Sequence, residues 1–187
     1  MNATLSKTLL FGGAIGSALL GAWSVRWFTA TADTDGVEVH MHSLVIDRDL
    51  AEYARDAELI VVGVVGANGA PYRVPAFERQ GTPDSVQHDV SVRVDEVLKG
   101  DPTLESVPVA VEGGRVGKMT VLAEDAVELK EGEEVLLFLG VNHRGDYVVY
   151  AGPNGKYRVD AGGNAEGFDG FKTTVDDVRD LLNTDPG

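Results

Sequence analysis

Two histidines and a glutamate alternate along one short stretch of the chain and could together hold a metal ion. In the segment VEVHMH, at 37–42, the residues Glu38, His40 and His42 occupy every second position, so in a β-strand they share one face. Imidazole nitrogens and a carboxylate oxygen suit zinc or copper, and the His-x-His spacing brings two such ligands close together. The alternative interpretation is a solvent-facing strand whose histidines bind no metal.

A glycine-rich stretch at 160–170, DAGGNAEGFDG, offers oxygen-bearing side chains at Asp160, Asn164, Glu166 and Asp169. Oxygen-rich loops can hold calcium, but the spacing here departs from that of an EF-hand loop. We therefore expect a solvated loop at this position rather than a calcium site, and no cofactor.

The sequence carries no motif of catalysis. It has no cysteine, which excludes thiol nucleophiles, disulfides and thiolate zinc sites, and no serine stands in a G-x-S-x-G elbow. The run GVVGANGA, at 63–70, lacks the spacing of a dinucleotide-binding loop, and Pro71 would stop the helix that must follow such a loop. The sequence therefore favours a protein that binds a partner over an enzyme.

Charge is distributed unevenly along the 187 residues. Residues 33–187 hold all 30 acidic residues and 14 of the 16 basic ones, which gives this part a formal charge of −16. A domain this acidic repels phosphate backbones, so nucleic-acid binding is not expected. With 17 aspartates against six lysines, the composition is typical of a halophilic protein, whose self-repulsion is screened by concentrated salt.

An apolar segment marks the N-terminus. Between Lys7 and Arg26 lie 18 uncharged residues. As a helix they would extend about 27 Å, close to the thickness of about 30 Å of a bilayer core. Residues 1–32 therefore form either a transmembrane anchor or a signal peptide that is cleaved after the small residues at 30–32. Both interpretations place the following domain outside the cytoplasm, at the cell membrane or secreted.

Hydrophobic periodicity predicts one domain over 37–183, with a linker at 33–36 before it and a tail at 184–187 after it. Helices are expected at 47–57 and 174–183, each with an aspartate or threonine that can cap its start. Strands are expected at 37–42, 58–65, 86–98, 106–113 and 131–141, and again near 147 and 156.

The predicted strands lie too close together in sequence for helical crossover connections. The fold class is therefore mostly β: a small OB-like β-barrel with peripheral helices, preceded by the N-terminal apolar helix. Gly63 stands inside an otherwise apolar strand and predicts a bulge or sharp bend there.

The segments DAELIVVGVV, VSVRVDEVLKG, VPVAVEGG and LKEGEEVLLFLG resemble the netrin-like form of the OB-fold. That form is known from tissue inhibitors of metalloproteinases and netrin modules, and many secreted or membrane-anchored microbial proteins share the pattern. In it a strand ending in a lysine-glycine turn follows a variable loop, and a G-x-x-x-L-x-F strand closes the barrel. The resemblance covers roughly residues 55–160. The inhibitors chelate zinc through an N-terminal cysteine, which this chain lacks, so no inhibitory mechanism and no site residue is implied.

The longest irregular segment, 67–85, separates the first two long strands. Its prolines and glycines predict a loop throughout, and its Tyr72, Phe77 and Arg79 are of types enriched at interfaces, so we predict a partner-binding loop. The predicted function is a non-enzymatic, membrane-anchored or secreted binding module whose partner is a protein or glycan at the cell surface. Two alternatives stay open: a structural component of the cell envelope, and a metal-binding protein or metalloenzyme that uses the His-x-His strand.

Overall fold

The computed structural model describes residues 7–11, 25–33, 36–44, 49–76, 84–124 and 126–184, the first three ranges as backbone alone. The chain divides into two compact units. The first comprises Met1–Leu44, Ala70–His88 and Glu112–Ala126. The second comprises Val45–Gly69, Asp89–Val111 and Val127–Gly187.

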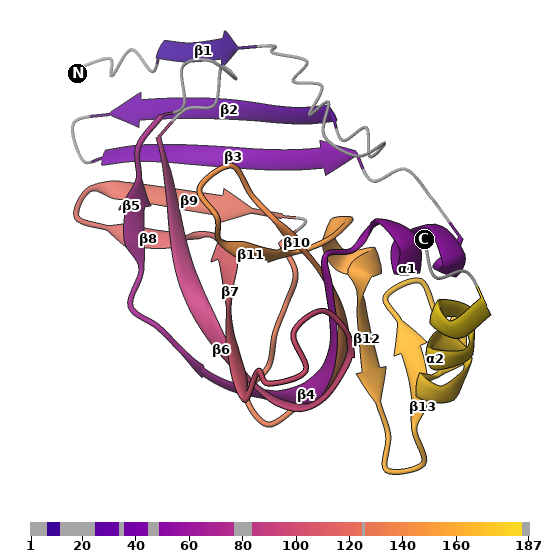
Figure 1. The fold of residues 1–187 in the computed structure, drawn as a ribbon. Helices are drawn as coiled ribbons and strands as arrows, with labels where there is room; N and C mark the ends of the chain where they lie inside the picture. The colour runs from indigo at the N-terminus through magenta and orange to yellow at the C-terminus, as the bar shows by residue number, and fades with distance from the viewer. Residues whose placement is uncertain are drawn as a thin grey trace. The chain divides into compact units, whose positions relative to one another are not determined.

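The second unit is built on a closed barrel of five strands. β4 (Leu59–Asn68) pairs antiparallel with β6 (Ser85–Lys99) on one side and with β10 (Glu134–Val141) on the other. β7 (Ser106–Glu112) lies next to β6 and runs parallel to β11 (Tyr147–Val149). β11 pairs antiparallel with β10, which closes the ring (Figure 1). The predicted mostly β fold, with a small barrel and two helices, is confirmed.

Strand β4 bends where its glycine stands. The register between β4 and β6 shifts at several points, one of them between Val62 and Gly63. A Cβ atom at Gly63 would lie 2.1 Å from the carbonyl oxygen of Arg93, so only glycine fits this close approach of the two backbones. Such shifts bend and twist a strand, which a small barrel needs in order to close. The bulge predicted at this glycine is confirmed.

Strand β10 is buried on both faces. Its five central residues, Val135 to Leu139, have no exposed surface. Leu136 and Phe138 belong to a core cluster that also contains residues of both helices. Because side chains alternate along a strand, Val135, Leu137 and Leu139 point to the opposite face, into the barrel. Burial on both sides explains why this strand is an uninterrupted apolar run in the sequence.

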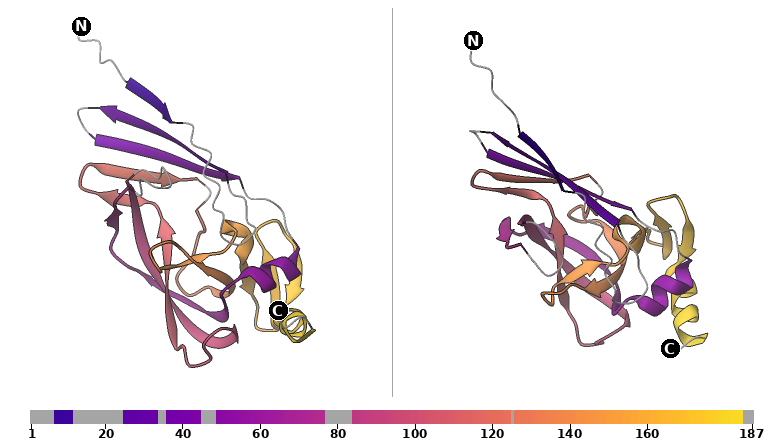
Figure 2. Two further views of the ribbon diagram at one scale, coloured as in Figure 1. Left: turned by 45° about the horizontal axis from the view of Figure 1, so that its top comes forward. Right: turned by 90° about the horizontal axis from the view of Figure 1, so that it is seen from above.

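Two capped helices cover the outer face of β10. In α1 (Leu50–Asp56) the Asp49 carboxylate accepts the Glu52 N–H at 2.8 Å, and the Lys99 ammonium donates to the carbonyls of the last turn. In α2 (Val175–Thr184) the Thr174 hydroxyl accepts the Asp177 N–H at 3.0 Å. Figures 1 and 2 show α1 beside α2. Both predicted helices are confirmed.

One edge of β10 carries two strands in succession. Its end pairs with β11, and its beginning pairs with β12 (Lys156–Val159), which runs in the same direction as β11. Between them the chain leaves the sheet for one 3-10 turn, η2 (Gly152–Gly155). β12 then pairs with β13 (Asn164–Gly167), and β13 with β14 (Lys172–Thr174). The strands β12, β13 and β14, residues 156–174, are called the extension below.

The first unit holds a five-stranded sheet in the order β1–β2–β3–β9–β8. Its strands are β1 (Lys7–Phe11), β2 (Val25–Asp33), β3 (Gly36–Leu44), β8 (Gly114–Val116) and β9 (Met119–Ala123). In the same unit, β5 (Tyr72–Val74) pairs antiparallel with the start of β6. Buried Val86 and Val121 form a small core there.

Two segments predicted as loops contain strands. In the 67–85 segment β5 forms between Pro71 and Pro75, so each proline stands just outside the paired residues and breaks no ladder bond. The 160–170 segment contains β13, which neighbouring strands stabilise on both sides. Prediction failed in both places because β5 and β13 are too short to show a period of their own. Each is stable only through pairing with another strand.

The apolar helix predicted within residues 1–32 lies largely outside the described residues. The parts of it that the structure describes are the strands β1 and β2. Among the helices of the described ranges, none is both long enough and apolar enough to cross a membrane.

Candidate functional site

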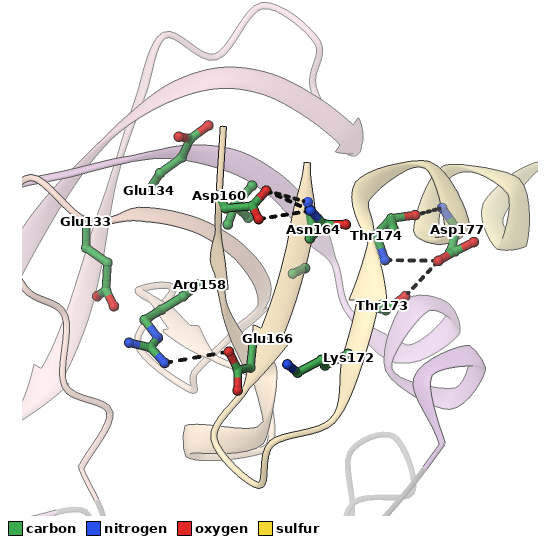
Figure 3. A pocket seen from close by; sticks show the side chains of 12 residues that line it. Glu133, Glu134, Arg158, Asp160, Asn164, Glu166, Lys172, Thr173, Thr174 and Asp177 are labelled. Carbon is green, nitrogen blue, oxygen red and sulfur yellow. Dashed lines mark hydrogen bonds and ion pairs between the residues drawn. The ribbon is translucent and has the colours of Figure 1, made fainter. Parts of the chain in front are cut away.

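The outer face of the extension forms an open depression with a volume of about 730 Å³ (Figure 3). Charged and polar side chains supply most of its lining, together with Val159 and Ala165. The charged members are Glu133, Glu134, Arg158, Asp160, Glu166, Lys172 and Asp177. The volume lies within the range of about 300–1,000 Å³ that is common for ligand pockets, although the lining is more polar than usual.

Strand register arranges these side chains in two rows. Arg158 pairs with Glu166 and Glu166 with Lys172, so one row crosses the three strands of the extension. Directly paired residues share a face of the sheet, and neighbouring strands lie about 4.8 Å apart. Asn164 pairs with Thr174 in the second row, which begins at Asp160 (Figure 3).

Three of the carboxylates in the lining are already used to hold the structure. Glu133 accepts the Lys156 ammonium at 2.5 Å, in an ion pair of which both side chains are largely buried. Asp177 accepts the Thr174 N–H at 2.9 Å at the start of α2. Asp160 accepts the side-chain amide of Asn164 and the N–H groups of Gly162 and Asn164, and these hydrogen bonds hold the pKa of the Asp160 carboxyl below its usual range.

Four charged groups keep most of their hydrogen-bonding capacity. They are the side chains of Glu134, Arg158, Glu166 and Lys172, and Figure 3 shows the last three in one row. Arg158 and Glu166 approach each other to 4.0 Å, and both are well exposed, so their attraction is weak. These four groups therefore present two acceptors and two donors to a ligand, within a lining that holds five carboxylates and two basic groups in all.

Two phenylalanines stand in the turn that joins β13 and β14. Phe168 is 78% exposed and Phe171 48% exposed, the two largest values among the exposed large hydrophobic residues of the described ranges. The turn is fixed by hydrogen bonds, since the Gly170 N–H donates to Gly167 O and the Phe171 N–H donates to the Asp169 carboxylate at 2.8 Å. The pair Glu166 and Lys172 directly precedes this turn, so the aromatic residues border the charged row.

A chain of aromatic rings connects the turn to the core. Phe171 lies edge-on to Tyr157 with ring centroids 6.4 Å apart, and Tyr157 lies edge-on to buried Phe138 at 5.7 Å. A Cβ atom on Gly167 would lie 3.1 Å from the Tyr157 ring, so the missing side chain lets the ring approach the backbone. Phe171 therefore packs on the protein, while Phe168 stays available to a ligand.

The second candidate surface is the connection between β4 and β6, residues 69–84. Its ends are held by β5, whose residues Tyr72 to Val74 pair with Ser85 to Gln87. Beyond this pairing, Asp84 accepts the Arg73 guanidinium and the Ala76 N–H, and these hydrogen bonds hold the pKa of the Asp84 carboxyl below its usual range. The described part of the connection, on both sides of 77–83, is thus held in place by strand pairing and by hydrogen bonds.

The structure places the predicted partner-binding residues in different ways. Tyr72 lies in β5 and is half-buried. Phe77 and Arg79 lie outside the described residues. Their role in binding stays a prediction.

The predicted metal ligands stand on β3, as the alternation of the sequence indicated. Glu38, His40 and His42 occupy alternate positions of this strand, which pairs with both β2 and β9. Their side chains lie outside what the structure describes. Where side chains are described, no group of three His, Asp or Glu residues is arranged to hold a metal ion.

Sequence reasoning missed the charged row of the extension. The residues Arg158, Glu166 and Lys172 come from three strands of three or four residues each, and glycines interrupt the pattern between them. The alternation of KYRVD at 156–160 was the one available signal, since it places Arg158 and Asp160 on the same face.

No protein-family model, curated protein or solved structure matches this chain.

Proposed function

We propose that the chain is a non-enzymatic binding module built on an OB-type barrel and displayed outside the cytoplasm, either membrane-anchored or secreted. The order of strands around the barrel supports this proposal. Numbered along the chain, the five strands β4, β6, β7, β10 and β11 follow one another around the ring as 1–2–3–5–4. The third and fifth strands are parallel, and every other pair whose direction is given is antiparallel. This is the arrangement of OB barrels, which serve widely as binding modules.

The fold alone does not determine function, so the choice of the contact surface depends on its own chemistry. The connection 69–84 joins the first and second barrel strands, a position from which OB barrels commonly contact ligands. Tyrosine, phenylalanine and arginine are enriched at protein interfaces, and the connection contains all three. Its base is fixed by β5 and by Asp84, which suits a recognition loop on a rigid scaffold. We therefore propose that the partner is a protein.

The contact region can be tested by replacing residues 77–83 with a Gly-Ser segment of equal length. This change leaves β5 and the Asp84 base intact, whereas a longer deletion would remove paired residues. We expect the melting temperature to change little and the capture of a partner from a cell-envelope extract to be lost. A control variant with Glu105→Gln should capture the same partner as the parent. Capture that survives the replacement would overturn the assignment of the contact region.

The proposed location can be tested by mass spectrometry of the mature N-terminus. A chain that begins near Asp33 is a secreted protein, and a chain that retains residues 1–32 is an anchored one. Reaction of the domain's lysines in intact cells with a membrane-impermeant amine reagent reports on the side of the membrane. A protein that is protected from the reagent until the cells are lysed would contradict an extracytoplasmic domain.

A further inference from the structure

We propose that the outer face of the extension is a second binding site, which takes a neutral oligosaccharide. The site comprises the charged groups of Glu134, Arg158, Glu166 and Lys172. The exposed ring of Phe168 stands two residues beyond Glu166, in the turn that follows it. The site lies within the second unit, and none of its residues belongs to the 69–84 connection. The proposal therefore goes beyond the binding function argued above.

The charge of the extension differs from that of the rest of the domain. Residues 156–174 contain three acidic and three basic side chains, so the extension has no formal net charge within a domain of −16. In the row Arg158–Glu166–Lys172 each charge has an opposite charge beside it, so a charged ligand would gain little net attraction. The lining of the depression as a whole holds five carboxylates against two basic groups, and this excess disfavours anionic saccharides and nucleic acids. Where side chains are described, no three acidic or histidine residues are arranged to hold a metal ion.

The depression offers both hydrogen-bond donors and hydrogen-bond acceptors. A sugar hydroxyl is both a donor and an acceptor, so it is best satisfied by a surface that offers both kinds of group. Glu134 and Glu166 supply acceptors, and Arg158 and Lys172 supply donors. Glu133, Asp160 and Asp177 are engaged by protein groups, which fixes the walls of the depression. Hydrogen bonds to charged groups are stronger than those between neutral groups, so a few such contacts could hold a weakly bound ligand in place.

The shape of the depression suits an extended ligand. The depression is open and spans three strands, with neighbouring strands about 4.8 Å apart, a spacing close to the length of one sugar ring. A short oligosaccharide could therefore lie across the strands with successive rings over successive side chains. Phe168, in the turn between β13 and β14, is 78% exposed, and an aromatic face can pack against the C–H groups of a sugar ring.

The test is titration of the purified full chain with neutral tetrasaccharides of glucose and of N-acetylglucosamine in several linkages, followed by NMR or calorimetry. We expect at least one of them to bind with a dissociation constant below about 1 mM. Amide shifts should concentrate at Arg158, Glu166 and Lys172. The affinity should be the same in 0.1 M and 2 M sodium chloride, because the ligand carries no charge.

Variants distinguish binding at this site from non-specific binding elsewhere on the protein. Glu166→Gln, Lys172→Gln and Phe168→Ala change exposed or half-exposed side chains, so each should fold and should weaken binding about tenfold or more. Glu105→Gln, an equal change of charge outside the depression, and the 77–83 replacement should bind as the parent does. Four results would each overturn the proposal: no neutral saccharide bound at 10 mM, binding unaffected by the three variants, binding of an acidic tetrasaccharide alone, or affinity that falls with salt.

Discussion

Strand β10 and the extension beside it belong to one sheet but expose opposite kinds of surface. β10 is buried on both faces, with the barrel on one side and the helical core cluster on the other. The extension uses one face for that cluster, through Tyr157 and Ala165, and turns the other, charged face to solvent. The difference separates a strand that stabilises the fold from a surface that faces solvent. Burial on two faces fixes the barrel, and the solvent-facing side of the extension is where we propose that an oligosaccharide binds.

The largest effect is expected from truncating the aromatic side chain at the centre of β10. Phe138→Ala removes a ring with no exposed surface and leaves a cavity between the sheet and both helices. We expect a loss of about 3–5 kcal/mol in the free energy of unfolding, measured by denaturant titration. Phe171→Ala, which alters a half-exposed ring on the extension, should cost less than about half as much. Equal losses of unfolding free energy in the two variants would contradict the difference in burial between β10 and the extension.

A smaller loss is expected where the barrel and the extension separate. A Cβ atom at Gly155 would lie 1.9 Å from the carbonyl oxygen of Tyr150, and a backbone atom cannot yield as a flexible side chain can. We expect Gly155→Ala to lower the free energy of unfolding by about 1–3 kcal/mol. Gly140→Ala, whose nearest neighbour would be a Tyr150 ring atom at 3.4 Å, is the matched control and should cost less than about 1 kcal/mol. If Gly155→Ala is as stable as the parent, the backbones of residues 150 and 155 do not approach each other as closely as the structure shows.

Salt should stabilise the domain because the domain is strongly acidic. Residues 33–187 carry a formal charge of −16, and the Debye length shrinks from about 30 Å at 0.01 M salt to about 3 Å at 1 M. We expect the melting temperature of the full chain to rise over this range and then to level off. The effect should weaken as the pH approaches the sequence pI of about 4.5, where protonation reduces the charge. A melting temperature that ignores salt at pH 7 would remove the argument for a halophilic protein.

The smallest effect is expected at the turn that begins the second row. The pKa of the Asp160 carboxyl is lowered, chiefly by the side-chain amide of Asn164, so its charge stabilises the folded state. That stabilisation is complete above the unfolded pKa of about 3.9 and is lost as the pH falls through the lower folded pKa. Asp160→Asn should therefore melt below the parent at pH 7, and the difference should shrink below about pH 4. A difference that stays constant with pH would mean that the charge of Asp160 has no part in the turn.

Prediction from sequence succeeded where the local pattern and the final environment agree. The apolar run of β10, the capped helices and the bulge at Gly63 each leave a signal within one short stretch of sequence, and the structure has all of them. The Lys99–Gly100 turn also has a physical basis. Lys99 caps the last turn of α1, and Gly100 has a φ of +111°, which favours glycine.

Prediction failed where an element exists only because of its partners. β13 and β14 are too short to show a period, and each is stable because a neighbouring strand supplies its hydrogen bonds. The charged row depends on the register of three such strands, so no single stretch of sequence contains it. The same holds for Asp84, which accepts hydrogen bonds from Arg73 and Ala76 in a segment that the sequence predicted to be a loop throughout.

The most direct test of the binding module is to place a photo-crosslinking amino acid in the 69–84 connection of the full chain in intact cells. Introduced at position 77 or 79, it should give one discrete adduct with a partner protein on irradiation. Introduced at the exposed position 105, directly before β7, it should not. Equal labelling from all three positions, or no adduct from 77 and 79 when the chain is displayed normally, would contradict the account.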